Sequence, residues 1–178
     1  MNNIDKELND LLQRYATLTL ESWNSTQVFT WEWWFLAFII TIPWLIFIRY
    51  LDRNRALEVW SFGLLVILIT SFVDDLGSEL SLWFYPTKFV PVGLIEYPFD
   101  FSIIPLGFML IYQNFNTWKT YIIALITLAL IFAFIGEPIS VWIGTVTYLK
   151  WKYQYSFVFY IVTGVIAKIF IQKLTPKS

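Results

Sequence analysis

Cysteine and histidine are both missing from this chain of 178 residues. Their absence excludes disulfides, thiolate nucleophiles, zinc sites built from Cys and His, haem ligation by either residue, and a histidine general base. Charge is also scarce: Asp, Glu, Lys and Arg make up 14% of the sequence, and the net charge is −1. Such a chain has no basic field that recruits nucleic acid. Any catalysis would depend on carboxylates, lysine, tyrosine or a bound hard cation.

Apolar residues dominate instead, at 58%, and aromatic residues reach 21%. Tryptophan and tyrosine concentrate where lipid meets water, so ten of each suit a polytopic membrane protein. The sequence predicts an all-α membrane helix bundle of about five transmembrane helices, although several runs fall short of the roughly 20 residues that a bilayer requires. Long side chains such as Lys168 would complete a crossing by extending to the headgroups. The uncharged runs are Trp33 to Ile48, Val59 to Val73, Phe101 to Trp118, Thr120 to Gly136 and Tyr153 to Ala167.

The first 30 residues combine charge with helical periodicity. Apolar residues recur at positions 4, 8, 11, 12, 15 and 18, and because charged residues lie between them we expect no secretory signal peptide here. We therefore expect residues 1–30 to form an amphipathic helix that lies on the membrane or packs against the bundle. Residues 31–178 then form the transmembrane bundle.

Lysine and arginine placement predicts the orientation. With the N-terminus outside, seven basic residues fall on the inner side and five on the outer side. The positive-inside rule then favours an external N-terminus and a cytoplasmic C-terminus. The inner residues are Arg49, Arg53, Arg55, Lys119, Lys168, Lys173 and Lys177; the outer ones are Lys6, Arg14, Lys88, Lys150 and Lys152.

Two loops, 76–97 and 138–149, are too apolar to extend into water and too short or too interrupted by proline to cross a bilayer. We expect interfacial or re-entrant segments that cover the outer mouth of the bundle.

Acidic residues gather at this same mouth. Charge at membrane depth is costly and usually has a partner or a function. Asp75 and Glu79 lie four apart and would share a helix face, so one of them would take a proton or a cation would lie between them. We expect an outer binding pocket, with Asp75 and Glu137 as candidate general acids. Its predicted residues are Asp74, Asp75, Glu79, Trp83, Glu96, Asp100, Glu137 and Trp142.

Two of these acids have a structural alternative. Asp100 follows Pro98, which suits the first position of a helix, so its charge would be favoured by the helix N-terminus. Glu137 lies between Gly136 and Pro138 and would mark the end of the fourth helix, where the dipole disfavours an anion. An ion pair with Lys150 or Lys152 would then hold the following loop in place.

The tryptophans and tyrosines around the mouth also have two interpretations. They form either an aromatic belt at the membrane interface or the lining of a pocket for a lipid, a prenyl chain or a cation. The residues are Trp31, Trp33, Trp34, Trp83, Tyr85, Trp142, Tyr148, Trp151, Tyr153 and Tyr155.

Six segments, taken in order, resemble a family of small, uncharacterised integral membrane proteins from spore-forming bacilli and clostridia. The resemblance covers roughly residues 45 to 175 and implies a bacterial plasma membrane protein. A fainter likeness, carried by Glu137-Pro138, is to small integral-membrane cyclases acting on carotenoid or other terpenoid chains. The segments are Phe72-Val73-Asp74-Asp75, Leu82-Trp83-Phe84-Tyr85-Pro86, Tyr97-Pro98-Phe99-Asp100-Phe101, Met109-Leu110-Ile111-Tyr112-Gln113, Gly136-Glu137-Pro138 and Trp151-Lys152-Tyr153-Gln154-Tyr155-Ser156.

Two functions remain open from the sequence. The first is a binding protein whose outer pocket takes a lipid, a cation or a partner, with carboxylates that form ion pairs or bind a hard cation such as Ca²⁺. The second is a membrane enzyme that acts on an isoprenoid or lipid through a protonated carboxyl group. Acids at one end only disfavour a transmembrane proton relay. No motif assigns a cofactor or a metal.

Overall fold

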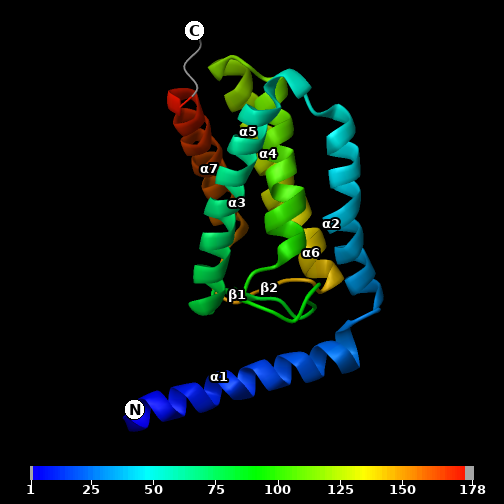
Figure 1. Cartoon of the computed structure of the whole chain (residues 1–178), viewed down its shortest axis with the longest axis vertical. Helices are drawn as coiled ribbons and strands as arrows, with labels where there is room; N and C mark the ends of the chain where they lie inside the picture. Colours follow the sequence, from blue (N-terminus) through cyan, green and yellow to red (C-terminus); the bar gives the residue numbers. More distant parts are fainter. Residues whose placement is uncertain (1, 175–178) are drawn as a thin grey trace.

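The computed structural model describes residues 2–174 and shows an all-α helix bundle (Figure 1). Four helical stretches are long and apolar enough to cross a membrane: Trp31–Tyr50, Arg53–Glu79, Trp118–Ile143 and Tyr153–Leu174. They correspond to α2 (Trp31–Tyr50), α3 (Ala56–Glu79) with its 3₁₀ start η2 (Arg53–Arg55), the series α5 (Trp118–Ile131), η4 (Phe132–Gly136) and α6 (Glu137–Ile143), and α7 (Tyr153–Leu174). The predicted all-α bundle is confirmed.

The third predicted span, Phe101 to Trp118, is shorter than expected. It consists of a π-helical turn, η3 (Phe99–Ile103), and α4 (Ile104–Asn114), and its helix ends before the predicted limit at Trp118. Thr117 explains the break, because its hydroxyl accepts the backbone N–H of Thr120 and so begins α5 as a new helix. The segment still traverses the bundle, and α1 and the last turn of α7 lie at opposite ends of the molecule (Figure 1).

The N-terminal segment is helical, as predicted. Helix α1 (Asn3–Ser22) begins with a capping box between Asn2 and Asp5 and runs across one end of the bundle (Figure 1). None of its side chains is buried, and a π-helical turn, η1 (Trp23–Gln27), leads from it towards α2. An amphipathic helix in this position has its apolar side chains available to the lipid surface.

Prolines in two neighbouring elements each leave a backbone carbonyl without its intrahelical donor. A side chain of the other element supplies the missing donor in both cases. Pro43 in α2 has no N–H for the carbonyl of Ile39, and the Ser102 hydroxyl donates to that oxygen at 2.7 Å. Pro105 in α4 has no N–H for the carbonyl of Phe101, and the Trp44 indole donates to it at 3.0 Å. Backbone groups at membrane depth need such partners, so these bonds fix η3 against α2.

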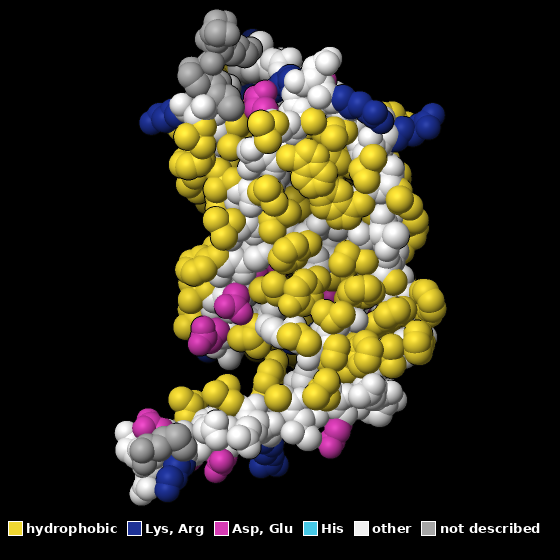
Figure 2. All heavy atoms as spheres, in the orientation of Figure 1, with side chains coloured by type: hydrophobic (Ala, Val, Ile, Leu, Met, Phe, Trp, Pro, Cys, Tyr) yellow, Lys and Arg dark blue, Asp and Glu magenta, His cyan; other side chains and the backbone are white. Residues whose placement is uncertain are grey.

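The end of the bundle opposite α1 contains a buried lysine. Lys168 is 1% exposed, with its ammonium 3.8 Å from the ring centre of Tyr121 and hydrogen-bonded to the carbonyl of Phe115 at 3.2 Å. The prediction that Lys168 extends to the headgroups is therefore wrong, because aromatic rings and a carbonyl satisfy its charge inside the protein. The predicted inner residue Lys177 lies outside the described residues. Lysine and arginine side chains gather at this end in Figure 2.

The two apolar loops meet beneath the opposite end. Short strands β1 (Trp83–Phe84) and β2 (Thr147–Tyr148) pair antiparallel, and the carbonyl of Leu82 accepts the N–H groups of Leu149 and Lys150. Helices α3 and α6 extend into the predicted loop regions, to Glu79 and Ile143. The paired strands and the loop 80–98 form a cap, which closes this end of the bundle.

Candidate functional site

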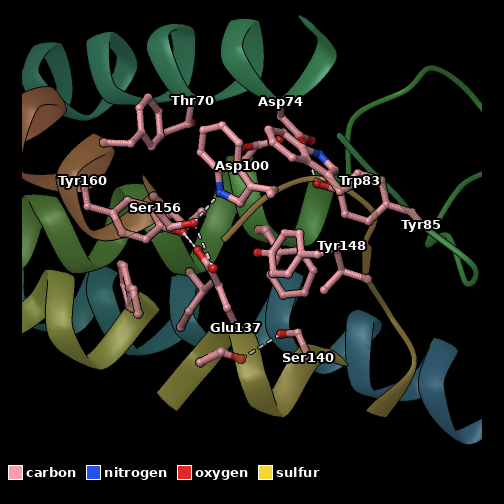
Figure 3. A pocket seen from close by; sticks show the side chains of 18 of the residues that line it. Thr70, Asp74, Trp83, Tyr85, Asp100, Glu137, Ser140, Tyr148, Ser156 and Tyr160 are labelled. Carbon is pink, nitrogen blue, oxygen red and sulfur yellow. Dashed lines mark hydrogen bonds between the residues drawn. The ribbon is translucent and has the colours of Figure 1, made fainter. Parts of the chain in front are cut away.

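A cavity of about 210 Å³ lies directly above the cap, inside the bundle. Its walls are mainly apolar, and its polar groups come from two sides (Figure 3). Asp74 and Asp100 approach from α3 and η3, and Glu137 approaches from the start of α6 on the other side. Charged groups among apolar walls need hydrogen-bond partners, so the partners of each carboxyl group define what the cavity can do.

Asp74 fastens the cap to the bundle. It lies in the last turns of α3 and is 8% exposed. Its Oδ1 accepts the indole N–H of Trp83 at 2.7 Å and the hydroxyl of Tyr85, and its Oδ2 accepts the backbone N–H of Glu96 at 3.0 Å. Three donors on one carboxyl group is the arrangement that stabilises the ionised form.

Asp100 lies against Asp74. Its carboxyl group is within hydrogen-bonding reach of the Asp74 carboxyl and of the Thr70 hydroxyl, and the side chain is 3% exposed. One oxygen, Oδ2, is buried and has no hydrogen-bond partner among residues 2–174. Two carboxyl groups in contact away from water cannot both be charged, so this pair shares a proton. Since Asp74 accepts three donors, the proton belongs on Asp100.

The helix does not end at Glu137, contrary to the prediction. Pro138 has no N–H to donate, and the π-helical turn η4 accommodates this missing hydrogen bond. The helix therefore continues as α6 from Glu137. Glu137 accepts hydrogen bonds from the hydroxyls of Ser156 at 2.9 Å and Tyr160 at 3.0 Å, both on α7. The Tyr148 hydroxyl of β2 also approaches it. Hydroxyl donors therefore satisfy this carboxyl group inside the cavity.

The predicted ion pair of Glu137 with Lys150 or Lys152 is not formed. Both lysines are exposed, and within residues 2–174 the ion pair that the structure shows is Arg55–Glu58, at 3.0 Å. The indole of Trp151, next in the chain, instead donates to the Ser156 hydroxyl at 2.8 Å and so extends the hydrogen-bond chain to Glu137.

Glu96 lies in the cap, just outside the cavity. It is 1% exposed, its Oε1 accepts the N–H of Phe89 at 3.1 Å, and its Oε2 has no hydrogen-bond partner among the described residues. Burial raises the pKa of Glu96 to about 8, against the opposing effects of the Phe89 N–H and the Lys88 charge. Glu96 is therefore mostly neutral at pH 7 and serves the site through its backbone bond to Asp74.

The remaining predicted site residues do not line the cavity. Asp75, Glu79 and Trp142 are exposed, and Trp142 reaches 83% exposure. Neighbouring residues on a helix point about 100° apart, so α3 can direct only one of Asp74 and Asp75 into the bundle. The predicted role of Asp75 as general acid therefore has no geometric basis, and Asp100 takes its place beside Asp74.

The aromatic residues divide between the two predicted roles. Trp31 and Trp34 are exposed in the first turn of α2, as in an interfacial belt. Trp83, Tyr85, Tyr148 and Trp151 line the cavity. Sequence reasoning missed Ser156 and Tyr160, although their spacing of four residues on an apolar helix is a signal that two polar groups share one face.

Neither a metal site nor a similarity to known proteins assigns a function to the cavity. Within residues 2–174, no group of three or more acidic side chains is arranged to hold a metal ion. No family model, curated protein or solved structure matches the chain. The function is therefore inferred from the chemistry of the cavity itself.

Proposed function

We propose that this chain is an integral membrane protein that binds a membrane-dissolved amphiphile in the cavity above the cap. The ligand has an apolar body and a polar group that donates hydrogen bonds. The supporting observation is the Oδ2 atom of Asp100, which is buried at the cavity wall without a partner among the described residues. An unpaired buried acceptor is costly, and a ligand donor would satisfy it.

The cavity walls support an apolar ligand body. The lining residues include Phe35 and Ile39 of α2, Ile103 of η3, Ile104 of α4 and Phe132 of η4. The cavity volume is about 210 Å³. Such a space takes a ring or a short branched segment, and a longer chain would extend out of it.

The proposed location is the outer face of a bacterial plasma membrane, with the N-terminus outside. The excess of lysine and arginine at the end opposite α1 supports this orientation. The cavity then opens near the outer leaflet, and the cap and α1 lie at the external interface.

Native mass spectrometry of the gently solubilised protein tests the proposal. We expect a retained molecule that organic extraction identifies as a lipid, an isoprenoid or another amphiphile. Asp100→Asn should lower its occupancy, whereas the exposed Asp75→Asn, a matched change at the same end of the bundle, should not. A cavity that is empty in the wild-type protein and stays empty when amphiphiles are added would refute the proposal.

A second candidate function, an enzyme acting on an isoprenoid or lipid, is favoured by the carboxyl pair facing Glu137. A protonated Asp100 can donate a proton to a carbon–carbon double bond, and Glu137 can remove a proton from the resulting carbocation. The net change is an isomerisation or cyclisation, after which solvent returns the proton from Glu137 to Asp100. Aromatic faces such as Trp83 and Tyr160 would stabilise the cation.

Deuterium incorporation distinguishes enzyme from binding protein. With isoprenoid substrates in D₂O, an enzyme of this type should yield a product that carries deuterium at the protonated carbon. Asp100→Asn and Glu137→Gln should each abolish product while the protein remains folded, and Asp75→Asn should remain active. A ligand that is bound and released unchanged would exclude the enzyme and leave the binding function.

A further inference from the structure

We infer that the ligand of this cavity is a lipophilic cation, an ammonium group attached to an apolar chain or ring. The inference rests on the proposed binding function and adds the charge of the ligand to it. Three carboxyl groups line the cavity, those of Asp74, Asp100 and Glu137, and its lining contains no lysine or arginine.

Hydrogen-bond donors favour the ionised form of two of these carboxyl groups. Asp74 accepts three donors, and Glu137 accepts the hydroxyls of Ser156 and Tyr160. Asp100 keeps the proton that it shares with Asp74. Each donor favours the charged form of its acceptor, while distance from water opposes it. A cation in the cavity would stabilise the ionised forms of Asp74 and Glu137 against this effect of burial.

The lysine of the cap loop, Lys88, has its hydrogen-bond partners outside the cavity. The Lys88 ammonium donates to the carbonyl of Gly93 at 2.6 Å and approaches the Tyr15 hydroxyl at 3.5 Å. It lines a second cavity of about 440 Å³ between α1 and the cap and does not line the first; Trp83 and Tyr85 line both. Within residues 2–174, no ion pair reaches Asp74 or Glu137. The negative charge is therefore not neutralised by the protein itself.

Aromatic rings supply the second feature of an organic-cation site. A cation over a ring face is attracted by the ring quadrupole, and the attraction increases when water is excluded. Carboxylates together with aromatic faces are suited to an alkylammonium group, whose charge is compact and whose substituents are apolar. The aromatic residues of the lining are Phe35, Trp83, Tyr85, Phe99, Phe132, Tyr148, Trp151, Phe159 and Tyr160.

Two observations point to a ligand rather than to a closed structural cluster of acids. The Asp100 Oδ2 atom is buried at the wall with no protein donor among the described residues, and an ammonium group has N–H groups to give it. Ile139 lines the cavity and is also 44% exposed, so a single apolar side chain lies between the cavity and the outer surface of the bundle. With Ile139 displaced, the apolar part of a cation would leave the cavity at this position and continue into lipid.

Dodecylamine and dodecanol form the test pair, because they share a chain and differ in charge. The full chain is reconstituted in phosphatidylglycerol nanodiscs, and binding of each radiolabelled probe is measured at pH 7 against empty nanodiscs. We expect dodecylamine to bind at least about tenfold more tightly than dodecanol. Glu137→Gln should remove most of that preference, since it keeps the side-chain shape and loses the charge. Glu79→Gln, an exposed matched control, should keep it.

Each outcome has a definite meaning. Equal or tighter binding of dodecanol would overturn the cation while leaving the amphiphile site in place. Failure of both probes to bind would overturn the proposed function as well. A preference that survives in folded Glu137→Gln would also refute the inference. The wild-type comparison needs no variant, so it stands even if Glu137→Gln fails to fold.

The ammonium could belong to a bilayer lipid or to a free amine. Nanodiscs that also contain phosphatidylethanolamine distinguish the two sources, because an aminophospholipid that occupies the site would displace dodecylamine. Unchanged dodecylamine binding in these nanodiscs would assign the site to free lipophilic amines.

Discussion

Ser102 donates its hydroxyl proton to the backbone carbonyl of Ile39 at 2.7 Å, and this carbonyl is the one that Pro43 leaves without an intrahelical donor. The Trp44 indole makes the reciprocal bond to the carbonyl of Phe101, which Pro105 leaves open. The two bonds hold η3 against α2 at the level of the cavity. Ile39 itself lines the cavity, and Asp100 lies two residues before Ser102, so the same contacts position the carboxyl pair.

Ser102→Ala should destabilise the protein by about 1–3 kcal/mol, because it leaves a buried carbonyl without a donor. In a Pro43→Ala background the helix can supply its own N–H to Ile39, so the same substitution should then cost clearly less. The measurement is the free energy of unfolding of the four proteins in one detergent. Equal costs of Ser102→Ala in the two backgrounds would show that the hydroxyl has a different role.

Asp74→Asn should loosen the cap. The amide cannot share a proton with Asp100 as a carboxylate does, and its NH₂ group conflicts with the donors from Trp83, Tyr85 and Glu96. We expect a loss of about 2–4 kcal/mol in unfolding free energy. Asp75→Asn, the adjacent exposed position, should stay within about 0.5 kcal/mol of wild type. Similar effects of the two changes would contradict the assignment of Asp74 as the fastening residue.

Gly77→Ala should disturb the hydrogen bond between Trp83 and Asp74 by displacing the Trp83 ring. A Cβ at Gly77 would lie 2.1 Å from Cη2 of the Trp83 ring, so the ring would have to move and its bond to Asp74 would lengthen. Overpacking of this kind costs about 1–3 kcal/mol. At Gly136 a Cβ meets nothing closer than a carbonyl oxygen at 3.7 Å, so Gly136→Ala is the matched control. Hydrogen exchange of the Trp83 indole should quicken in the first variant only.

The stability of the cap should decrease as pH rises. Burial raises the pKa of Glu96 from an ordinary 4.5 to about 8 in the folded protein, so folding favours its neutral form. This contribution is complete below about pH 4.5 and is lost as pH rises through 8. The melting temperature should therefore fall by at least about 4 °C between pH 5 and pH 9. Glu96→Gln, which is permanently neutral, should flatten this part of the profile, and an unchanged slope would exclude Glu96 as its source.

The fold class could be predicted from the sequence because apolar runs of near-span length leave few alternatives to a membrane helix bundle. The position of the acidic site at one end followed from Asp74, Asp100 and Glu137 lying near the ends of those runs. The choice between Asp74 and Asp75 could not be predicted, because α3 is apolar on all sides and its inward face is set by packing. The same applies to Lys168, whose aromatic surroundings come from other helices.

Helix boundaries were the other source of error. Gly136-Glu137-Pro138 predicts a helix end by local rules, yet a single π-helical turn lets the helix continue and directs Glu137 into the cavity. Thr117, on the other hand, begins a helix inside a run that composition alone treats as continuous. Both cases depend on backbone hydrogen bonds that apolar periodicity does not report.

The orientation in the membrane can be tested cleanly because the chain has no cysteine. Lys152→Cys and Lys119→Cys replace the same residue type at exposed positions, one beside the cap and one at the start of α5 at the opposite end. With the N-terminus outside, a membrane-impermeant maleimide should label Lys152→Cys in intact cells and Lys119→Cys only after permeabilisation. The reverse pattern would place the acidic cavity on the cytoplasmic side. Labelling of both from one side would contradict a bundle that spans the bilayer, since the two positions lie at opposite ends of its helices.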